Sequence, residues 1–240
     1  MTEILSPVGS FEAFYSAINA GSDALYLAGN KYGARKAIDD FSLEDIKLIV
    51  KISHLYKVKV YVTINTLIFD DEIDELIDYT DKLYLMGVDA FIIQDLGLLN
   101  LFSKRYKDLD LHISTQANTK TLEEVKFYEQ FKNVTRIVLA RETSIDEIRR
   151  IKENTKLEIE VFVHGAICMS YSGNCLFSSL TFNRSGNRGE CAQPCRLKYT
   201  LLENNKVLDD NKYLLSPKEL NTIYYVSELV KLNIDSLKIE

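Results

Sequence analysis

Short apolar, β-branched segments alternate with segments of helical periodicity along most of the chain. Apolar runs bounded by turn residues predict strands, whereas apolar positions three and four residues apart predict amphipathic helices. The predicted strands cover residues 3–7, 24–29, 58–65, 90–95, 109–116, 136–142, 157–165 and 234–240. The predicted helices cover residues 11–20, 42–56, 71–86, 96–106, 122–131, 145–154 and 216–232.

This alternation indicates an α/β fold in which a helix returns the chain from each strand to the next parallel strand. The unit recurs every ~25–35 residues, and eight strands favour a (β/α)8 TIM-type barrel over an open doubly wound sheet. No Gly-rich phosphate-binding turn follows the first strand, which argues against a dinucleotide-binding fold. We expect residues 1–240 to form a single barrel domain.

A segment of about residues 166–215 interrupts the alternation and contains all four cysteines of the chain. A long segment without regular elements inside a compact domain is usually functional. Because it follows the seventh strand directly, we expect it to pack over the end of the barrel where the βα loops lie. Helical structure is predicted to resume at Ser216, an N-cap residue followed by Pro217 at the first helical position.

The composition is that of a folded protein outside membranes. Hydrophobic residues make up 46% of the chain and charged residues 27%, which excludes a mainly disordered state. The net charge of -6 argues against a DNA-coating protein. No apolar run approaches the ~20 residues of a membrane span, and the first residues lack the features of a signal peptide. We therefore expect a cytoplasmic protein, in which cysteines are thiols or metal ligands more often than disulfides.

Polar residues end several predicted strands, and in such barrels the C-terminal strand ends surround the active site. Asp95, Gln116 and Glu142 are therefore candidate catalytic residues. The alternative is that such residues cap helices or bind loop backbone, which suits Asp95. We expect one mouth to be surrounded by Pro7, Asn65, Asp95, Gln116, Glu142 and His164.

The three histidines have different predicted roles. His164 stands four residues after Glu160 and four before Cys168, so it is a candidate base beside a nucleophile or a neighbour of a metal site. His54 is expected on a helix surface, and His112 is expected to pack inside the barrel. No standard hydrolase motif accompanies them.

The cysteines have the spacing C-x6-C-x15-C-x3-C, formed by Cys168, Cys175, Cys191 and Cys195. Four thiolates on one segment suit a tetrahedral sulfur site for zinc or for an iron–sulfur cluster. A zinc ribbon would show two C-x2-C pairs, which are absent here. Spacing alone leaves an iron–sulfur cluster, zinc and unligated thiols open.

Basic residues share the cysteine segment with Phe177, Phe182 and Tyr199. Basic and aromatic side chains together can contact an RNA backbone and stack on its bases. The alternative is a solvated surface loop. The candidate RNA-binding residues are Arg184, Arg188, Arg196 and Lys198.

The segment Glu160-Val-Phe-Val-His-Gly-Ala-Ile-Cys-Met-Ser-Tyr-Ser-Gly-Asn-Cys175 resembles the signature of peptidase family U32, the collagenase-like peptidases of unknown catalytic type. The C-terminal Ser236-Leu-Lys-Ile-Glu240 resembles the start of a longer family segment, so we expect the chain to be truncated relative to the family. Further matching segments are Leu5-Ser-Pro-Val-Gly-Ser10, Gly33-Ala-Arg35, Ser114-Thr-Gln-Ala117, Leu139-Ala-Arg-Glu142, Arg188-Gly-Glu-Cys-Ala-Gln-Pro-Cys-Arg196 and Leu215-Ser-Pro-Lys218.

This resemblance implies RNA chemistry or proteolysis. Some family members are named for proteolysis, and others are similar to proteins that hydroxylate the wobble uridine of tRNA or a cytidine of large-subunit ribosomal RNA. For the RNA branch, it implies a [4Fe-4S] cluster, a requirement for prephenate and a paralogous partner subunit. It places the cluster on Cys168, Cys175 and Cys191, with Cys195 as the fourth ligand because Asn221 stands where some relatives have a cysteine.

Three functions are therefore carried forward. The first is an iron–sulfur-dependent RNA hydroxylation enzyme, with the tRNA wobble uridine as the first substrate and a ribosomal RNA cytidine as the second. Another is a collagenase-like peptidase that uses Glu160, His164 and Cys168. The last is a non-catalytic barrel with a structural zinc loop.

Overall fold

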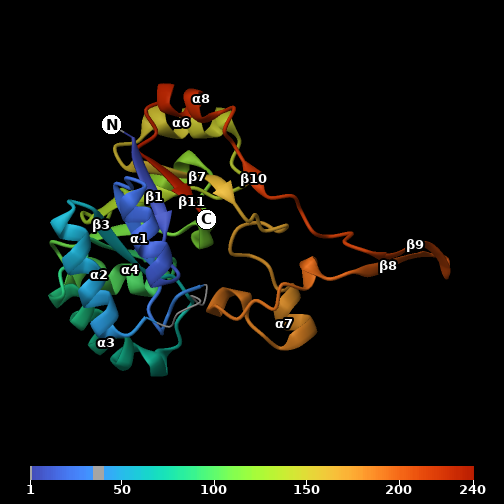
Figure 1. Cartoon of the computed structure of the whole chain (residues 1–240), viewed down its shortest axis with the longest axis horizontal. Coiled ribbons are helices and arrows are strands. Elements are labelled where there is room, and N and C mark those ends of the chain that lie inside the picture. The colour runs from blue at the N-terminus through green and yellow to red at the C-terminus, as the bar shows by residue number, and fades with distance from the viewer. Residues whose placement is uncertain (1, 35–40) are drawn as a thin grey trace.

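The computed structural model describes residues 2–34 and 41–240, and within them eight parallel strands close into a barrel (Figure 1). Neighbouring strands pair in chain order from β1 to β7, and β11 lies between β7 and β1. The predicted TIM-type barrel is therefore confirmed. Its strands are β1 (Glu3–Pro7), β2 (Ala24–Leu27), β3 (Lys59–Ile64), β4 (Ala90–Ile93), β5 (Asp110–Ile113), β6 (Val134–Val138), β7 (Glu158–Gly165) and β11 (Ser236–Ile239).

Helices cover the outside of the barrel, and side chains at their N-termini fix where they begin. Ser42 and Asp45 form the predicted capping box, in which each side chain accepts a hydrogen bond from the other residue's backbone. Ser10, Thr121 and Ser144 cap three further helices. The helices between barrel strands are α1 (Phe11–Asn19), α2 (Leu43–Leu55), α3 (Ile73–Leu85), α4 (Leu96–Arg105), α5 (Leu122–Tyr128) and α6 (Ile145–Asn154).

Alternation along each strand separates two packing regions. On β3, Val60, Val62 and Ile64 pack outward against the helices. Tyr61 packs in a second cluster with Leu5, Ala24, Ala90 and Ile92 inside the barrel. Because successive side chains of a strand point to opposite faces, the inward positions form layers that rise toward the C-terminal strand ends.

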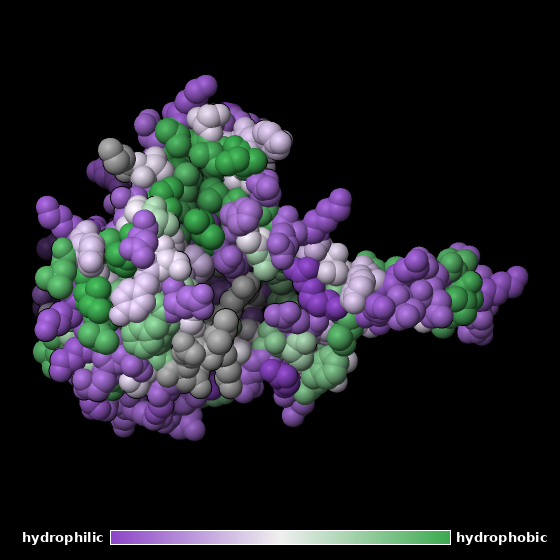
Figure 2. Space-filling model, viewed as in Figure 1, coloured by the Kyte–Doolittle hydropathy of each residue, from purple (hydrophilic) through white to green (hydrophobic). Residues whose placement is uncertain are grey.

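The segment after β7 contains more regular structure than its sequence predicts. It holds the short helix α7 (Phe177–Phe182) and the antiparallel hairpin of β8 (Tyr199–Glu203) and β9 (Lys206–Lys212). Figures 1 and 2 show this hairpin projecting away from the barrel. The same segment also holds the single-turn 3-10 helices η3 (Gly186–Arg188) and η4 (Pro194–Arg196), whereas η1 (Asp70–Glu72) and η2 (Thr115–Ala117) lie in earlier loops.

The prediction of one helix over residues 216–232 is wrong. Only α8 (Val226–Lys231) is helical, and β10 (Leu220–Asn221) pairs antiparallel with the end of β7. Arg196 donates hydrogen bonds to the Ser216 hydroxyl and to the Pro217 carbonyl, and these tertiary contacts compete with helix formation despite the capping residues. Within the described ranges, no helix combines the length and the apolar character needed to cross a membrane.

Candidate active site

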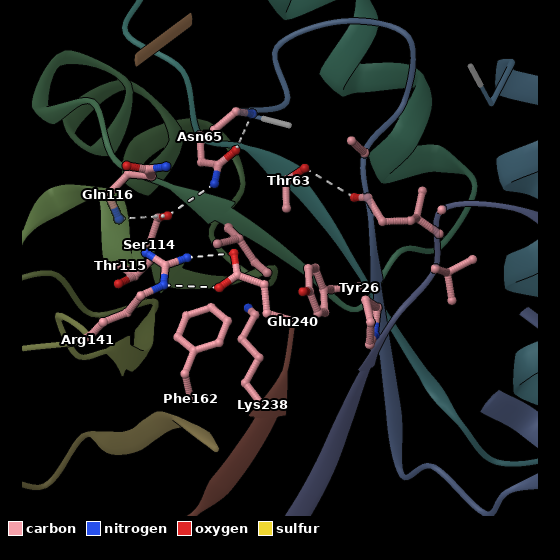
Figure 3. A pocket seen from close by; sticks show the side chains of 17 residues that line it. Tyr26, Thr63, Asn65, Ser114, Thr115, Gln116, Arg141, Phe162, Lys238 and Glu240 are labelled. Atoms are coloured by element: carbon pink, nitrogen blue, oxygen red, sulfur yellow. Dashed lines mark hydrogen bonds and ion pairs between the residues drawn. The ribbon is translucent and has the colours of Figure 1, made fainter. Parts of the chain in front are cut away.

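A cavity of about 400 Å³ opens at the C-terminal ends of the barrel strands (Figure 3). Its walls are the uppermost inward positions of the strands together with the loops that follow them. Pro7, Asn65 and Gln116 were predicted at this mouth and line the cavity. The complete lining is Pro7, Val8, Gly9, Tyr26, Leu27, Ala28, Ala34, Thr63, Asn65, Ile92, Ser114, Thr115, Gln116, Arg141, Phe162, Lys238 and Glu240.

Hydrogen bonds fix one polar wall of the cavity. Asn65 Oδ1 accepts a hydrogen bond from the Ala34 backbone N at 2.9 Å, and Asn65 Nδ2 donates to Ser114 Oγ at 3.1 Å. Ser114 Oγ also accepts from the backbone N of Gln116 at 3.2 Å. In the described part of the chain, no hydrogen bond engages the side-chain amide of Gln116, although it lines the cavity. This amide is therefore available to a bound molecule.

Both cations among the described residues of the cavity wall are paired. Arg141 donates to both carboxylate oxygens of Glu240, at 2.7 and 3.0 Å, and both side chains are 7% exposed. Lys238 Nζ donates to Glu160 at 2.9 Å and lies 4.1 Å from the centre of the Tyr26 ring. The Arg141 guanidinium lies 4.5 Å from the centre of the Phe162 ring.

Glu160 lies one inward position below Phe162 and is fully buried. Its carboxylate accepts hydrogen bonds from Lys238 and, at 3.0 Å, from Arg136. Burial alone would raise the pKa of Glu160, but Lys238 and Arg136 outweigh it and hold that pKa below its usual range. Glu160 is thus an ionised member of a charge network beneath the cavity.

His164 is exposed and does not line the cavity. A bulge in β7 pairs Lys238 with Phe162 but Ile239 with His164, which shifts His164 out of the inward alternation. No hydrogen bond joins its ring to another described residue. The structure therefore does not bring Glu160, His164 and Cys168 together as a nucleophile with its base.

Asp95 and Glu142 lie at the same end of the barrel but outside the cavity. Asp95 caps α4 by accepting from the backbone N of Leu98 at 3.0 Å, the alternative recognised from the sequence. Glu142 accepts from the backbone N and the hydroxyl of Ser172, at 3.2 and 2.9 Å. Asp95 therefore organises a helix, and Glu142 holds the cysteine segment.

The cysteine segment lies over the barrel mouth, as predicted. Besides Ser172, Gly173 comes so close that a Cβ on it would stand 1.9 Å from the carbonyl oxygen of Gln116. A Cβ on Gly189 would stand 2.5 Å from the carbonyl oxygen of Gly33. These close approaches place the segment against loops on two sides of the cavity. Arg35, which follows that loop, lies outside the described residues.

The four thiols are free. Burial raises the pKa of the Cys195 thiol, and the charges of Cys168, Cys191 and Cys175 raise that pKa further. The backbone N of Gln193 donates to Cys191 Sγ at 3.4 Å. Among the described residues, no three Cys, His, Asp or Glu side chains are arranged to hold a metal ion. The donor chemistry suits a thiolate-bound centre, for which the sulfurs would have to draw together.

The four basic residues of the segment differ in their surroundings. Arg188 donates to Glu72 and to the Leu67 carbonyl, and Arg196 is held by three oxygen acceptors. Arg184 is exposed, and exposed Lys198 lies 5.4 Å from the centre of the Tyr213 ring. Arg188 and Arg196 therefore brace the segment, whereas Arg184 and Lys198 present their charges to solvent.

The sequence analysis missed several residues of the cavity, among them Tyr26, Phe162, Lys238 and Glu240. The two-residue alternation of inward-facing side chains along the strands could have identified them. Phe162 follows Glu160 by two positions, and Lys238 and Glu240 share one face of the last barrel strand.

Comparisons with known proteins match nearly the whole chain. A sequence model of peptidase family U32 matches residues 9–240. A 23S rRNA 5-hydroxycytidine synthase of Escherichia coli is 41% identical over 239 residues, covering 99% of this chain and 36% of that protein. A tRNA hydroxylation protein of Bacillus subtilis is 36% identical, covering 99% and 58%.

A third relative is a collagenase of Porphyromonas gingivalis, which is 35% identical over 99% of this chain and 60% of its own length. The chain thus spans less than two thirds of the length of these relatives. Among solved structures, the U32 peptidase Mk0906 superposes over 100% of this chain and 92% of its own, with a TM-score of 0.69 at 17% identity.

Proposed function

This chain belongs to peptidase family U32, and we propose that it is the barrel portion of a [4Fe-4S]-dependent enzyme that hydroxylates a pyrimidine base of RNA. The wobble uridine of tRNA is the first substrate proposed, and a cytidine of ribosomal RNA is the second. The observation that carries the proposal is the position of the four-cysteine segment, which packs against loops bordering a cavity at the barrel mouth. Relatives named for hydroxylation of both kinds of RNA support it.

Cys168, Cys175, Cys191 and Cys195 would hold the cluster, with the Gln193 backbone N donating to the sulfur of Cys191. Such a cluster would supply electron transfer. The protein's own residues would bind and orient the base, and the cysteine segment would exclude water from the mouth. Prephenate belongs to the same proposal as a required small molecule, and a paralogous subunit as a partner. RNA substrates would place this work in the cytoplasm.

A peptidase is supported less well. Both carboxylate oxygens of Glu160 are engaged by cations, and His164 has no hydrogen-bonded nucleophile among the described residues. Nucleophilic catalysis needs a base within reach of its nucleophile and oriented by a third group. Because one relative is named a collagenase, the experiment below also tests for proteolysis.

The test is expression of the protein in Escherichia coli lacking its own RNA hydroxylation proteins. Hydroxylated uridine and cytidine would be measured in digested tRNA and ribosomal RNA, and iron, sulfide and zinc in anaerobically purified protein. We expect modified nucleoside with about four irons per chain, and loss of both in the Cys191→Ser variant. Leu180→Ser, an exposed change in the same segment, is the matched control.

Modified nucleoside made by an iron-free protein would refute the cluster. Zinc as the sole metal, without modified nucleoside, would support the structural zinc loop. Cleavage of collagen peptides without RNA modification would support the peptidase.

A further inference from the structure

The cavity has room for a small ligand, and the two cations among its described lining residues are both paired with carboxylates. Its volume of about 400 Å³ lies within the ~300–1,000 Å³ typical of small-molecule sites. Arg141 is neutralised by Glu240, and Lys238 by Glu160 beneath it. A phosphate or carboxylate placed here would have to break one of these pairs, which are at most 7% exposed, and leave a buried charge unpaired. The described lining therefore favours an uncharged ligand.

The apolar walls suit a planar ring. The rings of Tyr26 and Phe162 both border the cavity, and each has a paired cation against it. Ile92 and Pro7 add aliphatic surface. Flat heteroaromatic molecules gain from such walls because aromatic and apolar contacts replace water without requiring charge.

Gln116 offers the cavity a side-chain amide that has no hydrogen-bond partner among the described residues. Its backbone is held from two sides, since its N–H donates to Ser114 Oγ and Gly173 lies against its carbonyl. Its side-chain amide carries donors and an acceptor that no described residue uses. The neighbouring amide of Asn65 is already taken by Ala34 and Ser114. Gln116 is therefore the side-chain amide of this wall that can bind a ligand.

We propose that this cavity receives one uncharged pyrimidine base, extruded from RNA, and that the Gln116 amide hydrogen-bonds to its Watson–Crick edge while the sugar and phosphate stay outside the mouth. This inference rests on the proposed function and assigns its substrate-binding residues. The Watson–Crick edge of uracil or cytosine presents a donor beside an acceptor, which one amide can satisfy. Enzymes that modify a base read it in this way after taking it out of the stack.

The decisive variant is Gln116→Met, which removes the amide and keeps a side chain of similar length. Gln130→Met, an exposed change on another part of the barrel, is the matched control. Binding of uridine and of cytidine would be followed by saturation-transfer NMR, which needs no catalysis. We expect stronger saturation of the base protons than of the ribose protons, about tenfold weaker binding in Gln116→Met, and no displacement by inorganic phosphate.

Ala28→Phe provides a second variant, because it places a large side chain in the cavity and leaves the residue at position 116 unchanged. We expect it to abolish nucleoside binding at an unchanged melting temperature. Modified nucleoside would be measured in cells for the same variants, so that binding and activity are read separately.

The outcomes distinguish the two proposals. Base binding that depends on Gln116 supports the inference, even if no RNA is hydroxylated, in which case only the proposed function fails. RNA hydroxylation that is equal in wild type and Gln116→Met overturns the inference and leaves the function standing. Failure of wild-type protein to bind either nucleoside, or displacement of both by phosphate, also overturns the inference.

Discussion

Arg188 donates a hydrogen bond from each terminal guanidinium nitrogen to a different carboxylate oxygen of Glu72, at 3.0 and 2.5 Å. The same guanidinium donates to the Leu67 carbonyl and lies 4.5 Å from the centre of the Phe69 ring. Glu72 belongs to the 3-10 turn before α3, and Arg188 stands three residues before Cys191. This pair fastens the cysteine segment to the barrel wall.

Replacing Arg188 with Lys should loosen the segment around Cys191. An ammonium group cannot form the two parallel hydrogen bonds by which a guanidinium binds both carboxylate oxygens. We expect Cys191 in the metal-free protein to be alkylated about fivefold faster, the factor that corresponds to ~1 kcal/mol of lost restraint. Mass spectrometry after timed iodoacetamide treatment measures this rate. Arg184→Lys, an exposed change nearby, should leave it unchanged, and equal rates in all three proteins would contradict the role of the pair.

Gly173→Ala should detach the cysteine segment from the barrel mouth. The new Cβ would stand 1.9 Å from the carbonyl oxygen of Gln116, and Gly173 also has a φ of +73°. The control is Gly87→Ala, which introduces the backbone strain without the steric clash. Gly87 has a φ of +83°, and nothing lies within 4 Å of a Cβ built there.

Both glycine replacements should therefore cost about 1 kcal/mol of backbone strain. We expect only Gly173→Ala to lose amide protection over residues 166–176 in hydrogen-exchange mass spectrometry. Equal protection in the two variants would show that the close approach to Gln116 is unimportant.

Glu160→Gln should destabilise the whole barrel. Removing the charge leaves Lys238 without its acidic partner in the barrel interior, and breaking a buried ion pair costs about 3–5 kcal/mol. Urea unfolding of the metal-free protein measures the free energy of unfolding. The exposed pair of Glu123 and Lys126 provides the control, since Glu123→Gln should change that free energy by less than ~1 kcal/mol. A Glu160→Gln variant as stable as the control would argue against a structural role for this network.

His112 should make stability fall in mildly acidic solution. Burial, followed by the charges of Arg136 and Lys238, holds the pKa of His112 well below its ordinary value, so the folded protein keeps the ring neutral. The unfolded chain binds a proton there below about pH 6.5, which favours unfolding by ~1.4 kcal/mol for each further pH unit. The folded protein gains this stability above that pH and loses it as the pH falls.

The measurement is the free energy of unfolding between pH 7.5 and 5.5. His112→Phe should flatten the decline over this range, whereas His164→Phe, an exposed change, should retain it. A decline of unchanged slope in His112→Phe would assign the acid sensitivity to other groups.

The barrel was predictable because its information is local. Periodicity identified every barrel strand within a few residues, and the capping pair Ser42 and Asp45 marked the start of α2 correctly. His112 was also predicted correctly as a packed interior residue, with its ring 4.6 Å from that of Tyr61. In each case, a short stretch of sequence determines the result.

Other features depend on partners far along the chain. Glu160 became part of a buried network because Arg136 and Lys238 share the barrel interior, which no spacing along one strand reveals. The β7 bulge displaced His164, although its position two residues after Phe162 suggested an inward side chain. Residues 216–219 include good helix-start residues, yet they are not helical, and Arg196 donates hydrogen bonds to Ser216 and Pro217. Long-range contacts override local preference at these positions.

Because β11 lies between β7 and β1, the barrel of a newly synthesised chain can close only after β11 has been made. When the first seven barrel strands have left the ribosome, β1 and β7 are still open edges, able to pair with other chains. The cysteine segment is made next, before residues 236–239 arrive to join those edges. Lys238 and Glu240 arrive with that final strand, so the cavity acquires its last wall only when the barrel closes.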